Sequence, residues 1–226
     1  MLVTEAFRRV PLFSQLGNAE LARLAHAAHE KSYAKDQPVF FEADPGDALY
    51  VVLTGQVRVV MIGEDGREVI LALLRVGDFF GEMALLDDAP RSAHVITMEP
   101  STLLLLRRED FRRCLHETPS IADGLLRELS RRLRQADSKI RGFAFLNADA
   151  RVADVLLSMA DKSDGVTISQ PVSRRILAQL VGASRETVSR AFSEFSKQGL
   201  IQVSRGAILI RDRGALEAAA GRHGSR

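Results

Sequence analysis

The sequence predicts an α+β protein in which an N-terminal β-roll, resembling a small jelly roll, is followed by a long helix and a C-terminal group of short helices. Short β-rich segments separated by turn residues occupy residues 38–107. A proline-free stretch at 121–145 has helical periodicity, and two short helical patterns flank Gly182. The chain has 226 residues, of which 46% are hydrophobic, which is enough for two buried cores. We therefore expect a roll at 1–119, the long helix at 120–146 and a C-terminal domain at 147–226.

The expected roll begins after short helical patterns in residues 5–33. Four glycines recur every 9 to 11 residues between positions 46 and 77, which is typical of turns in a small barrel or jelly roll. The segment 63–66, Gly-Glu-Asp-Gly, is typical of a hairpin tip, and only a short turn after Phe80 is expected to be helical. The expected strands are 39–41, 49–53, 57–62, 69–74, 94–98 and 103–106.

Apolar residues follow the long helix at alternating spacings of three and four, the a/d pattern of a coiled coil, with charged residues on either side. A seam this narrow predicts that two copies of the helix pack together in a symmetric homodimer. The alternative interpretation is a helix packed on its own domain. The seam consists of Leu126, Leu129, Leu133, Ala136, Ile140 and Phe143.

Residues 173–199 have the pattern of two helices joined by a tight turn. Gly182 supplies the turn, Ser184 is a good N-cap for the second helix, and Gly199 ends that helix. Apolar residues in the second helix are spaced for burial on one face, so its charged and polar residues face outward. Arginine can donate two hydrogen bonds to guanine and glutamate can accept one from cytosine. The pattern predicts a helix-turn-helix that reads the DNA major groove, and a merely solvated helix face is the alternative.

A β-hairpin is expected after the second helix, with strands at 201–204 and 207–211. A hairpin at this place is a wing, and Arg205 at its tip can contact a DNA phosphate or simply be solvated. Asn147 is a candidate hinge and N-cap for a helix at 149–162, and the tail from residue 215 is expected to be a frayed helix end. The candidate DNA-binding residues are Ser184, Arg185, Glu186, Ser189, Arg190 and Arg205.

A second candidate site lies between two expected strands, in residues 80–93. Gly81 lets a ligand approach the backbone, Arg91 adds a bidentate positive charge, and Ser92 adds a hydroxyl donor. Glu82 needs a partner that donates, either a sugar hydroxyl or an arginine. A surface ion pair between Glu82 and Arg91 is the alternative explanation.

Together the two sites resemble those of the cyclic AMP receptor protein (CRP/FNR) family of bacterial transcription regulators. The resemblance covers nearly the whole chain and is strongest at Gly81-Glu82, at Arg91-Ser92-Ala93 and at 181–190, with a match to the family's interdomain hinge at Leu146-Asn147. It implies a cyclic-nucleotide-binding β-roll, a dimerisation helix and a winged helix-turn-helix domain. It also implies a homodimeric regulator that binds a palindromic operator with GTG-containing half-sites, contacts RNA polymerase and is not an enzyme. The ligand-binding residues that it implies are Gly81, Glu82, Met83, Arg91 and Ser92 around the sugar and phosphate, Val59, Leu71 and Leu74 around the base, and Ala136 and Asp137 near adenine.

The chain departs from the family at positions 136 and 137, where members that respond to cyclic AMP have Thr followed by Ser or Asn. Ala136 has no hydroxyl, and Asp137 only accepts hydrogen bonds when ionised, although the adenine amine could donate to it. Cyclic AMP is the expected effector, while cyclic di-GMP or no effector remain the alternatives.

Charge and cysteine content set further bounds. Residues 1–146 hold 19 Lys and Arg against 21 Asp and Glu, whereas residues 147–226 hold 12 against 8, so the basic surplus lies with the helix-turn-helix. The single Cys114 excludes an internal disulfide and a four-thiolate iron–sulphur cluster, and no cysteine–histidine pair in the roll indicates haem. His26 and His29 are interpreted as a solvated helical pair, so no metal is expected. No apolar run exceeds the six residues 69–74 and no signal peptide is evident, so we expect a cytoplasmic protein without membrane contact.

Overall fold

A computed structural model describes residues 3–169, 173–204 and 207–222. The chain divides into two compact units, Met1–Leu133 and Arg134–Arg226, and the division falls inside the long helix.

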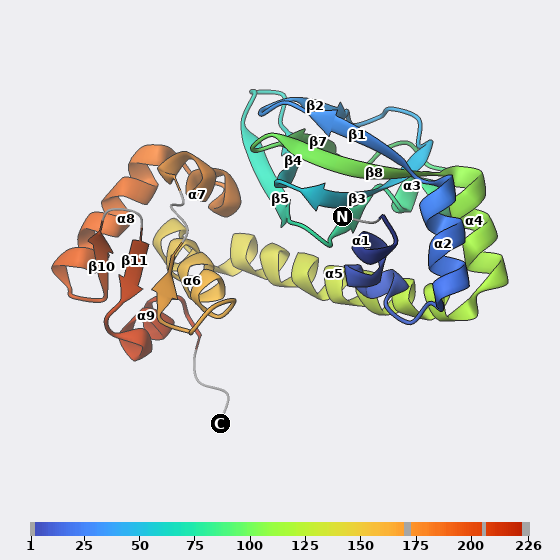
Figure 1. Cartoon of the computed structure of the whole chain (residues 1–226). Coiled ribbons are helices and arrows are strands. Elements are labelled where there is room, and N and C mark those ends of the chain that lie inside the picture. The colour runs from blue at the N-terminus through green and yellow to red at the C-terminus, as the bar shows by residue number, and fades with distance from the viewer. Residues whose placement is uncertain (1–2, 170–172, 205–206, 223–226) are drawn as a thin grey trace. The chain divides into compact units, whose positions relative to one another are not determined.

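The first unit contains two four-stranded antiparallel sheets, with strand orders β1-β8-β3-β6 and β2-β7-β4-β5 (Figure 1). This is the predicted β-roll. Aromatic and branched residues fill its interior, among them Tyr50, Phe80 and Leu103. The strands are β1 His29–Tyr33, β2 Pro38–Phe40, β3 Ala48–Thr54, β4 Val57–Ile62, β5 Glu68–Leu74, β6 Phe79–Phe80, β7 His94–Thr97 and β8 Ser101–Arg107.

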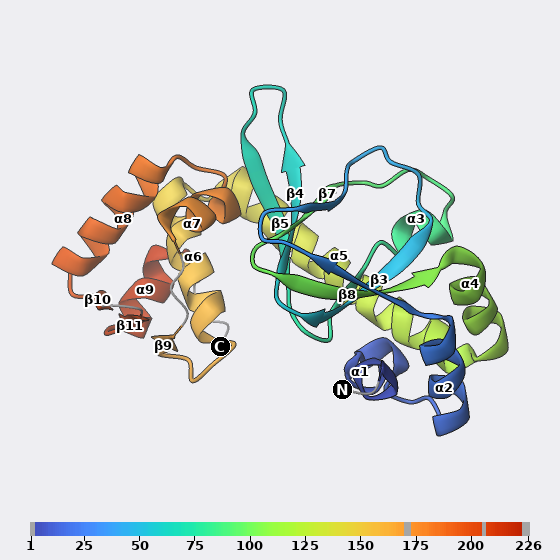
Figure 2. The same ribbon diagram turned by 45° about the horizontal axis from the view of Figure 1, so that its top comes forward.

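Helices cover one side of the roll and form a second core with it. Phe7 and Phe13 are fully buried there and meet edge to face, with ring centroids 5.3 Å apart. Figure 2 shows α1 and α2 near the start of α5, with the short helix α3 beside the strands. The helices of this unit are α1 Val3–Arg9, the 3-10 helix η1 Pro11–Phe13, α2 Asn18–Ala27, α3 Met83–Leu86, α4 Arg108–Glu117 and the first part of α5 Pro119–Phe145.

The short helical patterns predicted in residues 5–33 are confirmed up to Ala27 and wrong beyond it. Residues from His29 to Tyr33 form β1 and pair with β8 in the register His29↔Leu105 to Tyr33↔Ser101. Cross-strand pairing therefore overrides the weak local pattern. His26 ends up on a helix and His29 on a strand, so they are not a helical pair.

The long helix α5 has two different faces. Ile121 and Leu125 are buried in the core of the first unit. Leu126 is 63% exposed, and Leu133 and Ile140 are each 64% exposed. Leu129, expected in the same seam, is half-buried and packs against the core of its own unit.

The second unit packs short helices around a small antiparallel sheet with strand order β10-β11-β9. Three helices of this unit begin at an N-cap whose side-chain oxygen accepts a hydrogen bond from a backbone N–H; the caps are Asn147, Ser173 and Ser184. The caps at Asn147 and Ser184 were predicted. The prediction of a frayed tail is wrong, because Asp212 caps a further helix whose Leu216 is fully buried. The elements are α6 Ala148–Ala160, β9 Thr167–Ile168, α7 Arg174–Val181, α8 Arg185–Lys197, β10 Ile201–Ser204, β11 Ala207–Ile210 and α9 Arg213–Ala219.

Candidate functional site

Gly81 opens the first candidate site, directly after β6. Its φ of +84° is a backbone conformation that favours glycine. A Cβ atom at this position would lie 2.7 Å from Arg91 Nη1 and 3.1 Å from the Ala48 carbonyl oxygen. Gly81 is therefore required both for the turn and for the close approach of the Arg91 side chain.

Arg91 is held rigidly inside the roll and is only 3% exposed. Its guanidinium donates to the carbonyl oxygens of Gly81 at 2.7 Å and Ala48 at 2.9 Å, and to Asp47 Oδ1 at 3.1 Å. It also lies over the Phe40 ring, 4.3 Å from the centroid. Its Nε has no hydrogen-bond partner among the described residues. The result is a preorganised positive charge whose Nε donor is left to a ligand.

Glu82 is 2% exposed, so the alternative of a surface pair with Arg91 is wrong. Its Oε1 accepts from Arg132 Nη1 at 3.0 Å, while its Oε2 has no hydrogen-bond partner among the described residues. Burial raises the pKa of this carboxyl, and the positive charge of Arg132 acts in the opposite direction. A buried acceptor without a partner is costly, and a donor such as a sugar hydroxyl would satisfy it.

Sequence reasoning missed Arg132, which lies on α5 and was seen only as one of the charges that flank the seam. It donates to the Phe79 carbonyl oxygen at 2.6 Å and lies 4.6 Å above the Phe79 ring. Glu128, one turn earlier, accepts from Arg132 Nε at 2.8 Å. No local pattern reveals this contact, because Glu82 and Arg132 are 50 residues apart.

The remaining predicted ligand-binding residues of the first unit have different environments. Met83 is 49% exposed, and Ser92, also exposed, lies with Oγ 3.9 Å from Met83 Sδ. Leu74 is buried in the interior of the roll and Val59 packs against it. Leu71 is the extra residue of a β-bulge, since Val59 pairs with Ala72 and Val60 with Ile70, and it is 38% exposed.

The second unit contains the other predicted ligand-binding residues, Ala136 and Asp137. Both are exposed on the part of α5 that belongs to this unit.

The second unit also has the predicted geometry of a helix-turn-helix. Gly182 adopts the left-handed conformation with φ +60°, and Ser184 Oγ accepts from the Thr187 N–H at 3.1 Å. Helix α8 buries Val188 and three further apolar residues of the predicted face. The opposite face exposes Arg185, Glu186, Ser189 and Arg190. Arg205 lies outside the described residues.

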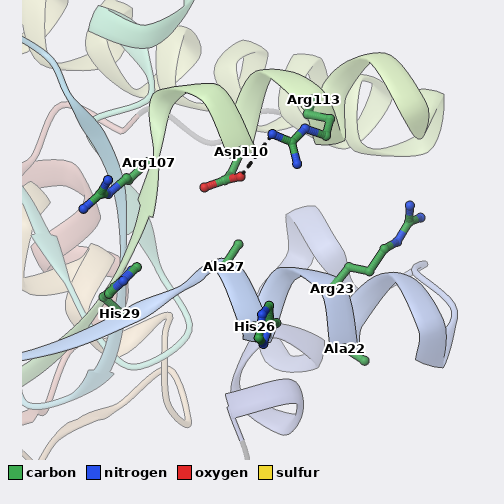
Figure 3. Close-up of a pocket in the computed structure, with 8 residues that line it drawn as sticks. All are labelled: Ala22, Arg23, His26, Ala27, His29, Arg107, Asp110 and Arg113. Carbon is green, nitrogen blue, oxygen red and sulfur yellow. Dashed lines mark ion pairs between the residues drawn. The ribbon is translucent and has the colours of Figure 1, made fainter.

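A separate pocket of about 650 Å³ lies between α2, β1 and α4 (Figure 3). Arg113 faces Asp110 at 3.6 Å, and Arg23 contacts Glu117 at 3.0 Å. None of its lining residues belongs to the two predicted sites. The pocket is lined by Ala22, Arg23, His26, Ala27, His29, Arg107, Asp110 and Arg113.

The described residues offer neither a metal site nor a membrane-spanning helix. Within them, no group of three or more His, Cys, Asp or Glu side chains could hold a metal ion. Among the same residues, no helix has the length and apolar character needed to cross a membrane.

Geometry alone defines a protein with a β-roll that holds a buried arginine and glutamate, joined to a winged helix-turn-helix unit. Two family models match these parts, the cyclic nucleotide-binding domain at residues 30–118 and the Crp-like helix-turn-helix domain at residues 150–219. Known relatives are similar in sequence over most of the chain. The cyclic AMP receptor protein of Thermus thermophilus is 36% identical over 207 residues, 92% of this chain and 95% of the relative. A CRP-like cAMP-activated global transcriptional regulator of Mycobacterium tuberculosis is 30% identical over 213 residues, with the same shares covered.

Solved structures of other proteins are also similar to this chain. FixK2 from Bradyrhizobium japonicum is 29% identical with a TM-score of 0.74, over 85% of this chain and 96% of that one. CLP, a c-di-GMP responsive global regulator from Xanthomonas campestris, is 26% identical with a TM-score of 0.74, over 86% and 99%. The chain belongs to the CRP family of transcription regulators. It is a DNA-binding regulator with a cyclic nucleotide-binding domain, and its family comprises regulators rather than enzymes.

Proposed function

We propose that the protein is a homodimer that binds a palindromic operator under the control of a cyclic nucleotide, with cyclic AMP as the effector. The observation that carries the proposal is the pair of buried, incompletely satisfied polar groups in the roll, Glu82 Oε2 and Arg91 Nε. A cyclic nucleotide offers one partner to each, because its ribose hydroxyl donates and its phosphate accepts.

The nucleotide's sugar and phosphate are bound by Gly81, Glu82, Met83, Arg91 and Ser92. Arg91 supplies the charge for the phosphate, and the exposed Ser92 supplies a hydroxyl donor. The base packs on Val59, Leu71 and Leu74. Ala136 and Asp137 on α5 lie near adenine, where Asp137 accepts from its exocyclic amine.

Cyclic di-GMP is the second candidate effector. Ala136 lacks the hydroxyl that would bind adenine, so one contact specific to cyclic AMP is missing, and the structurally similar CLP is described as c-di-GMP responsive. A regulator that acts without any effector is the remaining alternative.

Dimerisation uses the exposed apolar face of α5. Leu126, Leu133 and Ile140 are each more than 60% exposed in the single chain, which is unfavourable for leucine and isoleucine unless a partner covers them. A second copy of the same helix has the complementary seam, as two-fold symmetry requires. Ala136 and Phe143 continue this seam.

DNA recognition uses the exposed face of α8. The bases of a GTG-containing half-site are read by Arg185, Glu186 and Arg190. The sugar-phosphate backbone of the DNA is contacted by Ser184, Ser189 and Arg205. The nucleotide acts by shifting the population between two arrangements of the dimer. Family membership further supports a contact with RNA polymerase and a cytoplasmic location.

Fluorescence anisotropy of a labelled palindromic GTG…CAC duplex tests the proposal, with cyclic AMP, with cyclic di-GMP and with neither. We expect tight binding only in the cyclic AMP arm. Tight binding only with cyclic di-GMP would show that cyclic di-GMP is the effector and cyclic AMP is not. Equal binding in all arms would refute control by a nucleotide. The Arg91→Ala variant is the control for a direct effect of the nucleotide on the duplex.

A further inference from the structure

Phe143, a residue of the proposed dimer seam that is 45% exposed, also contacts the turn of the helix-turn-helix in its own chain. A Cβ atom at Gly182 would lie 2.7 Å from Phe143 Cε1 and 3.3 Å from Cζ. The ring therefore packs directly on the backbone of Gly182, where a larger residue would collide with it. Both residues belong to the second unit, so the contact lies within one compact body.

Arg151 on α6 reinforces this contact from a third element. Its guanidinium lies 5.3 Å from the centroid of the Phe143 ring. It donates through Nε to the Val181 carbonyl oxygen at 2.8 Å and through Nη1 to the Leu146 carbonyl oxygen at 2.7 Å. One side chain thus bonds the last residue of α7 and the residue that follows α5.

These contacts span the segment around Asn147 that the sequence indicates as a hinge. A hinge made only of backbone would let the reading helix α8 change its angle to α5 at little cost. Here an aromatic ring and a bidentate arginine fix the turn that precedes α8 to the end of α5. We name Phe143, Arg151 and Gly182 the clasp.

We propose that Phe143 and Arg151 are positioning residues that fix the reading helix to α5 and thereby determine which half-site spacing the dimer accepts. The inference rests on the proposed homodimer. In a dimer joined through α5, the second half-site is bound at an effective concentration that depends on how well the two reading helices match the DNA. Reading helices of a dimer fit half-sites about one turn of DNA apart, and one added base pair moves a half-site by about 3.4 Å and rotates it by about 35°.

A rigid clasp therefore makes the dimer sensitive to spacing. We expect wild-type affinity to fall about tenfold or more when one base pair is added to the spacer, because the rigid pair can no longer engage both half-sites. With a loosened clasp the penalty should fall below about threefold, and the affinity for the original spacing should fall as well, because a mobile reading helix is less well matched to any one site.

The experiment measures the anisotropy of four duplexes with the full-length protein, at saturating cyclic AMP and without nucleotide. The duplexes are the palindrome, the palindrome with one base pair added or removed in the spacer, and a single half-site. The test variants are Phe143→Ala and Arg151→Gln. Arg151→Gln lies outside the predicted seam and so separates a loosened clasp from a weakened dimer. Light scattering confirms the mass of every variant.

Matched controls are available on the same helix. Phe145→Ala removes a phenylalanine that is 82% exposed, and Arg141→Gln removes an exposed arginine. Both controls should keep the wild-type spacing penalty. Half-site affinity should remain within about threefold of wild type in all variants, because α8 itself is unchanged.

A reduced spacing penalty in both test variants, with the controls unchanged, would support the inference. A full wild-type penalty in Arg151→Gln and Phe143→Ala would overturn it. If wild type binds the half-site as tightly as the palindrome, the proposed dimeric function fails and the spacing role fails with it. If wild type binds the palindrome more tightly than the half-site, but the test variants keep the wild-type spacing penalty, the dimeric function stands and only the role of the clasp is refuted.

Discussion

Replacing Leu133 by alanine tests the proposed dimer most directly. Leu133 lies on the exposed face of α5 and is 64% exposed in the single chain. Full burial of a leucine side chain contributes about 1.5–3 kcal/mol. Covering the exposed 64% in a dimer therefore contributes about 1–2 kcal/mol in each chain and about 2–4 kcal/mol for the symmetric pair.

This free energy corresponds to a rise of about 30- to 700-fold in the dimer dissociation constant, at 1.4 kcal/mol for each factor of ten. Sedimentation equilibrium over a concentration series measures that constant for wild type and Leu133→Ala. Leu133→Glu should go further and yield monomers by light scattering, because two carboxylates would face each other across the seam.

The neighbouring Leu129 provides a matched control. It is half-buried against the core of its own unit, so Leu129→Ala should lower the melting temperature and leave the dimer dissociation constant near the wild-type value. An unchanged dissociation constant in Leu133→Ala would refute the proposed interface. Equal weakening by both variants would instead show that the seam predicted from the sequence, rather than the exposed face alone, joins the two copies.

Three further outcomes are expected. Arg91→Lys should weaken cyclic nucleotide binding about tenfold or more by calorimetry, because lysine cannot reproduce the guanidinium fork; unchanged affinity would argue against a phosphate site at Arg91. Arg185→Ala should cost about 1–3 kcal/mol of operator affinity and relax specificity at one base pair, whereas a uniform loss over all sequences would indicate a phosphate contact. Because the pKa of Glu82 is raised in the folded protein, wild type loses stability as the pH rises from the ordinary value of 4.5 through the raised pKa. Glu82→Gln lacks this titration, so urea unfolding at pH 5 and pH 8 should show the variant gaining relative to wild type at pH 8, and a constant difference would contradict the assignment.

Features that depend on local chemistry were predictable from the sequence. The turn at Gly182, the cap at Ser184 and the buried face of α8 follow from spacing, because a helix of 3.6 residues per turn brings these positions together. The hairpin tip at residues 63–66 also follows from local chemistry and is confirmed, because the Gly66 N–H donates to the Gly63 carbonyl oxygen at 2.9 Å.

Features that depend on residues far away in the sequence could not be predicted. The residues of β1 are mostly polar and exposed, and only pairing with β8 makes them a strand. The seam pattern gives one face of α5 but does not reveal that Leu129 is covered by its own unit. Glu82 was identified as needing a donor, but its arginine lies on a helix 50 residues later.

The same combination of contacts occurs in both units and explains why these arginines had no signal in the sequence. Arg132 lies over the Phe79 ring and donates to a backbone carbonyl, and Arg151 lies over the Phe143 ring and donates to two. In each unit the arginine joins α5 to a predicted site, at Glu82 in the first and at the turn before α8 in the second. An arginine used in this way needs only a ring and a carbonyl oxygen, which any folded chain offers in many places. Its role therefore arises from tertiary packing alone, and substitutions at Arg132 and Arg151 should affect ligand and operator binding without any change in the residues that contact ligand or DNA bases.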